Sequence, residues 1–288
     1  MAIFTNQAIL SYRNGTVSSN VVTGEIVEVL TATKNALIDT YSMGDTVTYV
    51  ISILNSGSTP IDSITVSDDL GAYQFNNTAL VPLTYVAGSV AFYIDGALQS
   101  APTVNVGTSL VFGNISVPAN GNAILIYQTR VNEFAPVCVN GEIVNTATVS
   151  GSGICEDIVV SETITASKAP MLGISKGISP TTVTDNGQLT YTFNIQNFGN
   201  SEATADDQIV VTDTFDPTLC PIVVTYNGEL WTEGEQYTYN RTTGVFSTVA
   251  GNITVPAANC DQDPESGVFN VTPGESTLVV VGTVSCEC

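Results

Sequence analysis

A long internal repeat restricts this chain to two copies of one fold. The segment Lys34–Gly57, with GDTVTY and NSG, recurs as Lys176–Gly199, with GQLTY and NFG. The match continues through three further pairs of segments: Ile64–Asp68 with Ile209–Asp213, Gly113–Ala119 with Gly251–Ala257, and Ile124–Val131 with Thr277–Val284. We therefore expect two related domains in tandem, which a length of 288 residues also favours.

The apolar runs inside each copy are typical of β-strands. They are short, rich in β-branched and aromatic residues, and bounded by Gly, Asn, Pro and Asp, and no amphipathic helical pattern separates them. The clearest runs are Thr46–Leu54, Ile61–Val66, Val90–Ile94, Ala123–Val131 and Gln188–Gln196. The sequence predicts an all-β protein made of two tandem immunoglobulin-like β-sandwiches.

The two copies end differently. The first copy continues after Val131 through Ile143–Ser150 and Ile158–Thr165, whereas only four residues follow Val284. Segments like these closing strands stand at the start of the chain: Phe4–Ser11 resembles Val144–Ser150, and Val21–Ile26 resembles Val159–Ile164. We expect residues 1–28 to be a donor strand segment, residues 29–168 the first sandwich, and residues 169–288 a second sandwich that lacks its closing strands.

A sandwich without its last strands exposes apolar core and an unpaired edge, which another chain can fill by strand addition. We expect residues 1–28 to complete the second sandwich of a neighbouring subunit. Such a head-to-tail contact does not close on itself and produces a filament. The alternative is that the N-terminal strands pack on the first sandwich and that the second sandwich is a shorter variant.

Lysine is scarce, and two of the three lysines stand at matching repeat positions. Lys34 and Lys176 each open a first strand, Asp68 and Asp213 each end a middle strand, and Asn145 and Asn6 stand on the closing segments. A lysine, an acid and an asparagine are what a spontaneous Lys–Asn isopeptide bond requires, because burial favours a neutral, nucleophilic amine and a protonated acid. Held in contact, the reaction is effectively unimolecular.

The sequence thus predicts two isopeptide bonds, one within a chain and one between chains. Lys34 and Asn145, with Asp68 as the catalytic acid, would form a bond within one chain. Lys176 and Asn6, with Asp213, would join successive subunits. The alternative is that both lysines are solvated and that Asp68 and Asp213 are turn residues that hydrogen-bond their own backbone.

Composition excludes several other functions. There are 27 acidic residues against 6 Lys and Arg, a formal net charge of −21, and no histidine. A polyanion or an anionic membrane surface is therefore not expected as a partner, and neither a histidine-based catalytic site nor a cofactor or metal site is expected. We expect no enzyme activity apart from the self-catalysed bond formation.

Six cysteines indicate oxidising surroundings, with pairing left open: Cys138, Cys155, Cys220, Cys260, Cys286 and Cys288. Cys138 and Cys155 flank the Asn145 strand and are expected to clamp it. Cys286 and Cys288 either link neighbouring subunits or pair locally with Cys220 or Cys260. Met1–Gln7 shows no ordinary secretory signal, so export by that route is not expected.

These motifs resemble a surface repeat family of Gram-positive bacteria, catalogued as domain of unknown function eleven. The residues that carry the resemblance are Lys34 or Lys176, the TY and N-x-G motifs, the V-S/T-D motif and Asn145–Val149 (NTATV). The resemblance implies an immunoglobulin-like sandwich in a cell-surface or spore-surface protein. Related surface sandwiches form Lys–Asn isopeptide bonds, which favours the positions named above. Assembly on a clostridial-type spore, from the mother cell, would reconcile the cysteines with the missing export signal.

We expect a structural subunit that self-assembles head to tail into a filament, with other copies of the chain as its partner. The alternative is a monomeric surface adhesin or ligand-binding β-sandwich module.

Overall fold

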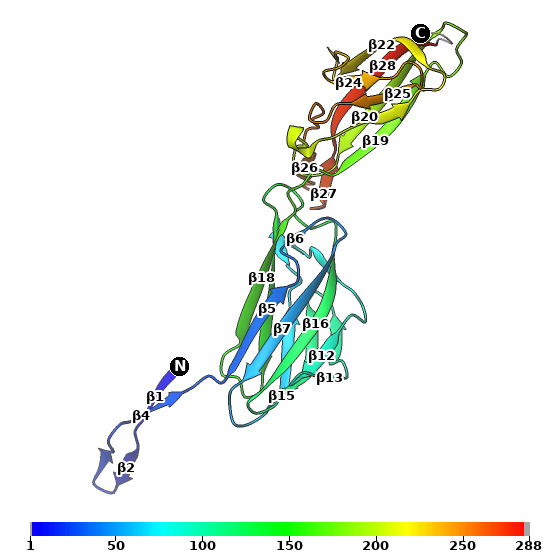
Figure 1. Cartoon of the computed structure of the whole chain (residues 1–288). Helices are drawn as coiled ribbons and strands as arrows, with labels where there is room; N and C mark the ends of the chain where they lie inside the picture. The colour runs from blue at the N-terminus through cyan, green and yellow to red at the C-terminus, as the bar shows by residue number, and fades with distance from the viewer. Residues whose placement is uncertain (1, 285–288) are drawn as a thin grey trace. The chain divides into compact units, whose positions relative to one another are not determined.

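The structure, a computed structural model, describes residues 2–284 and is almost entirely β (Figure 1). The single helix of these residues is the 3-10 helix η1 (Ala205–Asp207), and the described chain contains no helix long and apolar enough to cross a membrane. Two compact units are formed, one from Met1–Asp39, Gly44–Asn132 and Ile143–Ile164, the other from Thr40–Met43, Glu133–Glu142 and Thr165–Cys288. The prediction of an all-β chain of tandem sandwiches is confirmed.

Two sheets face each other in the first sandwich. One has the strand order β13-β12-β16-β7-β5, with β11 also paired to β16, and the other has the order β14-β15-β8-β17-β18-β6. The strands are β5 (Leu30–Ala36), β6 (Thr40–Tyr41), β7 (Thr46–Asn55), β8 (Ile61–Asp68), β11 (Leu83–Tyr85), β12 (Ala91–Ile94), β13 (Ala97–Gln99), β14 (Thr103–Val106), β15 (Leu110–Val117), β16 (Gly121–Val131), β17 (Glu142–Gly151) and β18 (Ile158–Ala166), with a separate ladder of β9 (Tyr73–Phe75) and β10 (Thr78–Leu80).

Alternation of side chains places the core of the first sandwich between these sheets. On β7, the alternate residues Val47, Tyr49, Ile51 and Ile53 are at most 1% exposed, because successive side chains of a strand point to opposite faces. The predicted strand runs of this copy match β7, β8, β12 and β16 to within two residues at each end.

The second sandwich has one complete sheet and one short sheet. The first has the order β19-β20-β28-β22-β23, and the second is β21-β25-β24. The bounds are β19 (Leu172–Ser179), β20 (Gln188–Asn197), β21 (Thr212–Thr214), β22 (Leu219–Tyr226), β23 (Glu229–Leu230), β24 (Tyr237–Tyr239), β25 (Val245–Thr248) and β28 (Gly274–Val284), with an added ladder of β26 (Asn259–Gln262) and β27 (Phe269–Thr272).

The repeat relates the sheets of the two sandwiches strand by strand. The order β19-β20-β28-β22-β23 corresponds to β5-β7-β16-β12-β13, and β21-β25-β24 corresponds to β8-β15-β14. Among the described residues, β17 and β18 have no counterpart in the second unit. As a result β21 is an edge strand, paired with β25 alone, whereas β8 is paired on both sides.

One predicted strand begins later than expected. The run Ile209–Val211 is not a strand, and β21 begins at Thr212. The backbone N–H of Val211 donates to the side-chain Oγ1 of Thr248 at 2.9 Å, so a side chain satisfies a group that a sheet ladder would otherwise bind.

The N-terminal residues form a separate ribbon, which we call the donor arm (residues 2–28). β1 (Ala2–Asn6) pairs with β4 (Val22–Ile26), and β2 (Ile9–Tyr12) pairs with β3 (Gly15–Ser18). Neither ladder joins a sheet of either sandwich in the described chain (Figure 1). Large apolar side chains of the donor arm are exposed, among them Ile3 (75%), Ile9 (70%) and Leu10 (65%).

A disulfide corrects both the predicted domain boundary and the predicted clamp. Cys138 is bonded to Cys260, with the two Cα atoms 5.5 Å apart, and this bond holds residues 133–142 in the second unit. Cys155 is free and exposed, so the expectation that Cys138 and Cys155 clamp the Asn145 strand is wrong. Cys220 is also disulfide-bonded, while Cys286 and Cys288 lie outside the described residues.

A buried asparagine fixes the same corner in each sandwich. The Asn55 amide donates to Thr59 O at 2.8 Å and Pro118 O at 3.0 Å, and its Oδ1 accepts from Gly57 N at 2.9 Å. Asn197 repeats this pattern with Ser201, Pro256 and Gly199. The N-x-G motif of the repeat is therefore a structural clamp between neighbouring loops.

We predict that Asn55→Ala destabilises the first sandwich by about 2–4 kcal/mol, because several buried backbone groups lose their partner. Urea unfolding followed by fluorescence measures the change. The matched control is Asn105→Ala on the exposed face of β14, which should leave the midpoint unchanged. Equal midpoints for the two variants would contradict the clamp.

Candidate functional site

Lys34 and Asp68 form an ion pair inside the first sandwich. Lys34 comes from β5 in one sheet and Asp68 from the end of β8 in the other, and Nζ lies 2.6 Å from Oδ2 with both side chains fully buried. The second oxygen of Asp68 accepts a hydrogen bond from Leu70 N at 2.9 Å. The alternative of a solvated Lys34 is therefore wrong, although Asp68 also makes the turn contact expected of such a residue.

Asn145 lies beside this pair on the neighbouring strand. β17 pairs with β8 so that Ala147, two residues along the same face, stands opposite Asp68. The Asn145 side chain is fully buried, and its Oδ1 accepts a hydrogen bond from Gly71 N at 3.2 Å. Its Nδ2 is buried without a hydrogen bond that meets normal geometry among the described residues.

Two tyrosines connect the three groups. The Tyr127 hydroxyl donates to Asp68 Oδ2, and the ring of Tyr49 lies 5.0 Å from Lys34 Nζ, a cation–π distance. The rings of Tyr49 and Tyr127 stack with centroids 5.8 Å apart. Both hydroxyls lie near the Asn145 amide, which acts to lower their pKa values. Lys34, Asp68 and Asn145 thus belong to one buried cluster.

Burial sets the protonation of this cluster. Desolvation lowers the pKa of Lys34, and attraction to Asp68 and the hydrogen bond that Lys34 donates to Asp68 only partly oppose that shift. Desolvation likewise raises the pKa values of Tyr49 and Tyr127, so both phenols stay protonated at neutral pH. Lowering the lysine pKa increases the fraction of neutral amine, which is the nucleophilic form.

Gly71 completes the cluster and was not predicted from the sequence. Its N–H polarises the Asn145 carbonyl in the way that an oxyanion hole does. Its φ is +72°, and an added Cβ would lie 2.5 Å from Ile143 Cγ2, so only glycine fits here. Tyr49 and Tyr127 were also missed; the TY motif contains Tyr49, but only three-dimensional pairing identifies Tyr127.

The second sandwich contains part of the same cluster in an open form. Lys176 of β19 contacts Asp213 of β21, but the lysine side chain is 40% exposed and the aspartate side chain 18% exposed. The Tyr191 ring lies 4.5 Å from Lys176 Nζ, as Tyr49 lies near Lys34. The position of Tyr127 is taken by Val280, which offers no hydroxyl. No asparagine strand of the described second unit accompanies this pair.

The surface beside this open cluster is apolar. Leu172 on β19 is 40% exposed, whereas its repeat equivalent Leu30 on β5 is 7% exposed. Ile174 (58%) and Ile178 (44%) extend the exposed row along β19. We call the β21 edge together with this row the acceptor edge. It is the place that β17 and β18 occupy in the first sandwich.

The donor arm places its residues in the matching order. Aligning Asn6 with Asn145 aligns Phe4, Ala8 and Leu10 with Ile143, Ala147 and Val149, which are at most 1% exposed. In the single chain Asn6 pairs with Val22 of β4, so its side chain belongs to the exposed ribbon. Within one chain, the structure brings Lys176 and Asp213 together. Asn6 lies on β1 of the donor arm and not beside this pair.

The described residues contain no cluster of three or more His, Cys, Asp or Glu side chains arranged to hold a metal ion.

Comparison with known proteins gives a likeness of fold only. No family model matches the chain, and no curated protein matches it; the resemblance to the surface repeat family stays a prediction. The solved structures with a partial likeness to the chain include the following three. The chain is similar to BcpA, the major pilin subunit of Bacillus cereus, at 14% identity and a TM-score of 0.35, covering 94% of this chain and 73% of that one.

In the other two structures, the chain covers a smaller share of the matched protein. The pilus backbone RrgB of Streptococcus pneumoniae is similar at 11% identity and a TM-score of 0.34, over 85% of this chain and 55% of that one. A family 123 glycoside hydrolase from Clostridium perfringens is similar at 11% identity and a TM-score of 0.32, over 48% of this chain and 27% of that one. Likenesses at this level do not bear on what the chain does.

We predict that the first sandwich loses the mass of one ammonia when it folds, and that Asp68→Ala retains the full mass because the catalytic acid beside Lys34 is removed. Intact-mass spectrometry of the purified monomer measures this. Asp62→Asn, on the exposed face of the same strand β8, is the matched control and should lose the ammonia. An unaltered wild-type mass would contradict the bond.

Proposed function

We propose that the chain is a structural subunit that polymerises head to tail, each donor arm closing the second sandwich of the next subunit. The observation that carries this proposal is the open edge of β21, at the position where β8 is covered by β17 and β18. The alternative in which the N-terminal strands pack on the first sandwich finds no support, because neither ladder of the donor arm joins one of its sheets.

Apolar burial supplies the driving force. Leu172, Ile174 and Ile178 stand exposed on β19, and fully burying a large aliphatic side chain contributes roughly 1.5–3 kcal/mol. Strand addition to β21 also satisfies backbone groups that its free edge leaves to water. In the sequence Phe4, Ala8 and Leu10 align with the buried residues Ile143, Ala147 and Val149 of β17, so an extended arm docked along β21 would follow the pattern of the first sandwich.

Each docking step would then be made permanent by a covalent bond. In the proposed reaction the neutral Nζ of Lys176 attacks the side-chain carbonyl carbon of Asn6, a new C–N bond forms, and the bond to Nδ2 breaks. Asp213, as the protonated acid, polarises that carbonyl, and one proton of the attacking amine passes to the departing nitrogen, which leaves as ammonia. Lys34, Asp68 and Asn145 would carry out the same reaction inside the first sandwich.

We place the filament on a cell or spore surface. The Cys138–Cys260 bond supports an oxidising location, since disulfides persist outside reducing compartments.

We predict that mixing two variants, Asn6→Ala and Lys176→Ala, gives one covalent dimer and no longer ladder. The Asn6→Ala chain supplies a reactive lysine and the Lys176→Ala chain a reactive amide, so a single bond forms and both outer ends are inert. Denaturing electrophoresis with mass spectrometry measures the product. Each variant alone should stay monomeric under denaturing conditions, and a ladder from Asn6→Ala alone would contradict the assignment.

We also predict that Leu10→Asp abolishes polymerisation, because the charge would be forced against the apolar side chains of the acceptor edge. Sedimentation and electron microscopy measure polymer independently of any covalent bond. The matched control is Thr5→Asp: Thr5 aligns with Val144, which is 44% exposed in the first sandwich, so this variant should polymerise. Equal assembly by both variants would contradict the proposed register.

A further inference from the structure

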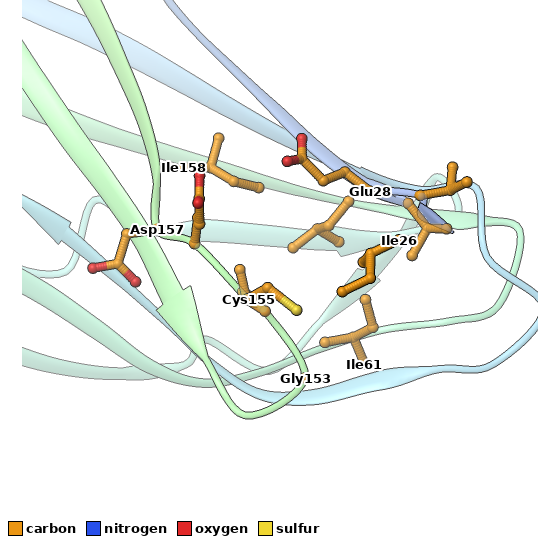
Figure 2. Close-up of a pocket in the computed structure, with 12 residues that line it drawn as sticks. Ile26, Glu28, Ile61, Gly153, Cys155, Asp157 and Ile158 are labelled. Carbon is orange, nitrogen blue, oxygen red and sulfur yellow. The ribbon is translucent and has the colours of Figure 1, made fainter. Parts of the chain in front are cut away.

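The loop that joins β17 to β18 lies against the start of β8 in the first sandwich. β17 ends at Gly151, and β8 begins at Ile61. An added Cβ on Gly153 of the loop would lie 3.9 Å from Ile61 Cγ2, and both residues line one pocket (Figure 2). Ser152 Oγ lies 3.5 Å from Asp62 O. The loop therefore covers the corner at which β8 begins, and Ile61 meets uncharged residues there.

The second sandwich has the same corner with a different residue. Ser63 and Gln208 are repeat equivalents, and both adopt the left-handed backbone, with φ values of 57° and 51°. By this alignment Asp206 of η1 stands at the position of Ile61. Asp206 is exposed, and among the residues that the structure describes its carboxylate has no hydrogen-bond or ion-pair partner. An apolar residue of the first sandwich is thus replaced by an unpaired acid in the second.

The donor arm has an arginine at the position of the covering loop. The alignment of the arm with β17 brings the end of β2, at Tyr12, to the end of β17, at Gly151. Both strands therefore turn at equivalent residues, and Arg13 stands at the position of Ser152. Arg13 is exposed and has no ion-pair partner within the described part of the chain. A docked arm would bring this free cation to the start of β21.

The end of the arm must follow a slightly wider path than β17. An added Cβ on Gly151 would lie 2.9 Å from Ser63 O, so Tyr12, which has a side chain, cannot approach the corner as closely. The long stem of an arginine spans such a gap, whereas a short side chain would not. The difference at Tyr12 is therefore compatible with a contact made by Arg13.

The distribution of charge favours this contact. The formal net charge of the chain is −21, so two copies repel each other at long range. Residues 1–24 contain none of the 27 acidic residues, and Arg13 is their one charged side chain. The corner at η1 carries the exposed acids Glu202, Asp206 and Asp207. The arm is thus the part of the chain that can approach this acidic corner with an attractive charge.

We infer that Arg13 of one subunit forms an ion pair with Asp206 of the next subunit. The inference rests on the proposed head-to-tail docking. Asp206 is favoured over Asp207, because the Asp207 carboxylate already accepts a hydrogen bond from Thr204 N at 2.7 Å. The pair also distinguishes the two sandwiches as targets of the arm: in the first, Arg13 would meet the apolar Ile61, and in the second it meets an acid.

The test uses the full chain carrying Asn6→Ala as the parent, so that no isopeptide joins the subunits and assembly is reversible. At about 0.01 M salt, adding Arg13→Glu should raise the protein concentration needed for polymer about tenfold, as measured by sedimentation. An exposed ion pair changes a binding constant by roughly two- to fivefold, and here repulsion also replaces attraction. Adding Asp206→Lys to Arg13→Glu should restore assembly. At about 1 M salt, where the screening length is about 3 Å, all these chains should assemble alike.

The matched control is Glu229→Lys, which changes the net charge as Asp206→Lys does. Glu229 is exposed on β23, at the edge of the sheet opposite to β19. Added to Arg13→Glu, it should leave the assembly defect in place.

The two proposals fail in different ways. If the parent polymerises and Arg13→Glu assembles as well as the parent does, or if Glu229→Lys restores assembly as well as Asp206→Lys, the docking stands and the ion pair is overturned. If sedimentation detects no polymer of the parent, the head-to-tail docking is wrong, and the ion pair is wrong with it.

Discussion

A β-sheet that ends beside an apolar core must have its last edge covered, and this requirement governs the molecule. In the first sandwich, β17 covers the edge of β8 and β18 pairs with β17, and the result is a buried interior that contains Lys34, Asp68 and Asn145. In the second sandwich β21 has one partner, and the corresponding lysine is 40% exposed. The Lys34 cluster is therefore buried and the Lys176 cluster exposed because the first sandwich has β17 and β18 and the described second sandwich has no counterpart of them.

Closure and chemistry are coupled because burial controls both. The same desolvation that drives Leu30 into the core lowers the pKa of Lys34. β17 carries Asn145 and also shields the cluster from water. The N–H of Gly71, in the turn after β8, donates a hydrogen bond to the side-chain carbonyl of Asn145 and polarises it. In the proposed isopeptide reaction, the covering strands would therefore supply the amide and also bury the lysine that attacks it.

Much of this arrangement could be predicted from the repeat. Matching Lys34 with Lys176 and Asp68 with Asp213 placed each pair correctly on facing sheets, because a repeated pattern of strands imposes a repeated pairing. The hydroxyl of Tyr127 and the N–H of Gly71 could not be found in this way, since both depend on contacts across the core. The Cys138–Cys260 bond was also beyond reach, because the β26–β27 ladder that presents Cys260 has no counterpart in the first copy.

The exposure of Lys176 has a consequence for the accuracy of growth. In the separate chain the Lys176 side chain is 40% exposed beside Asp213, and no asparagine strand of the described second unit lies against it. A subunit that docks out of register leaves this side chain in water and can dissociate again. Only a correctly docked strand would bury Lys176. In the proposed filament, an incorrectly docked subunit would therefore dissociate before a covalent bond could form.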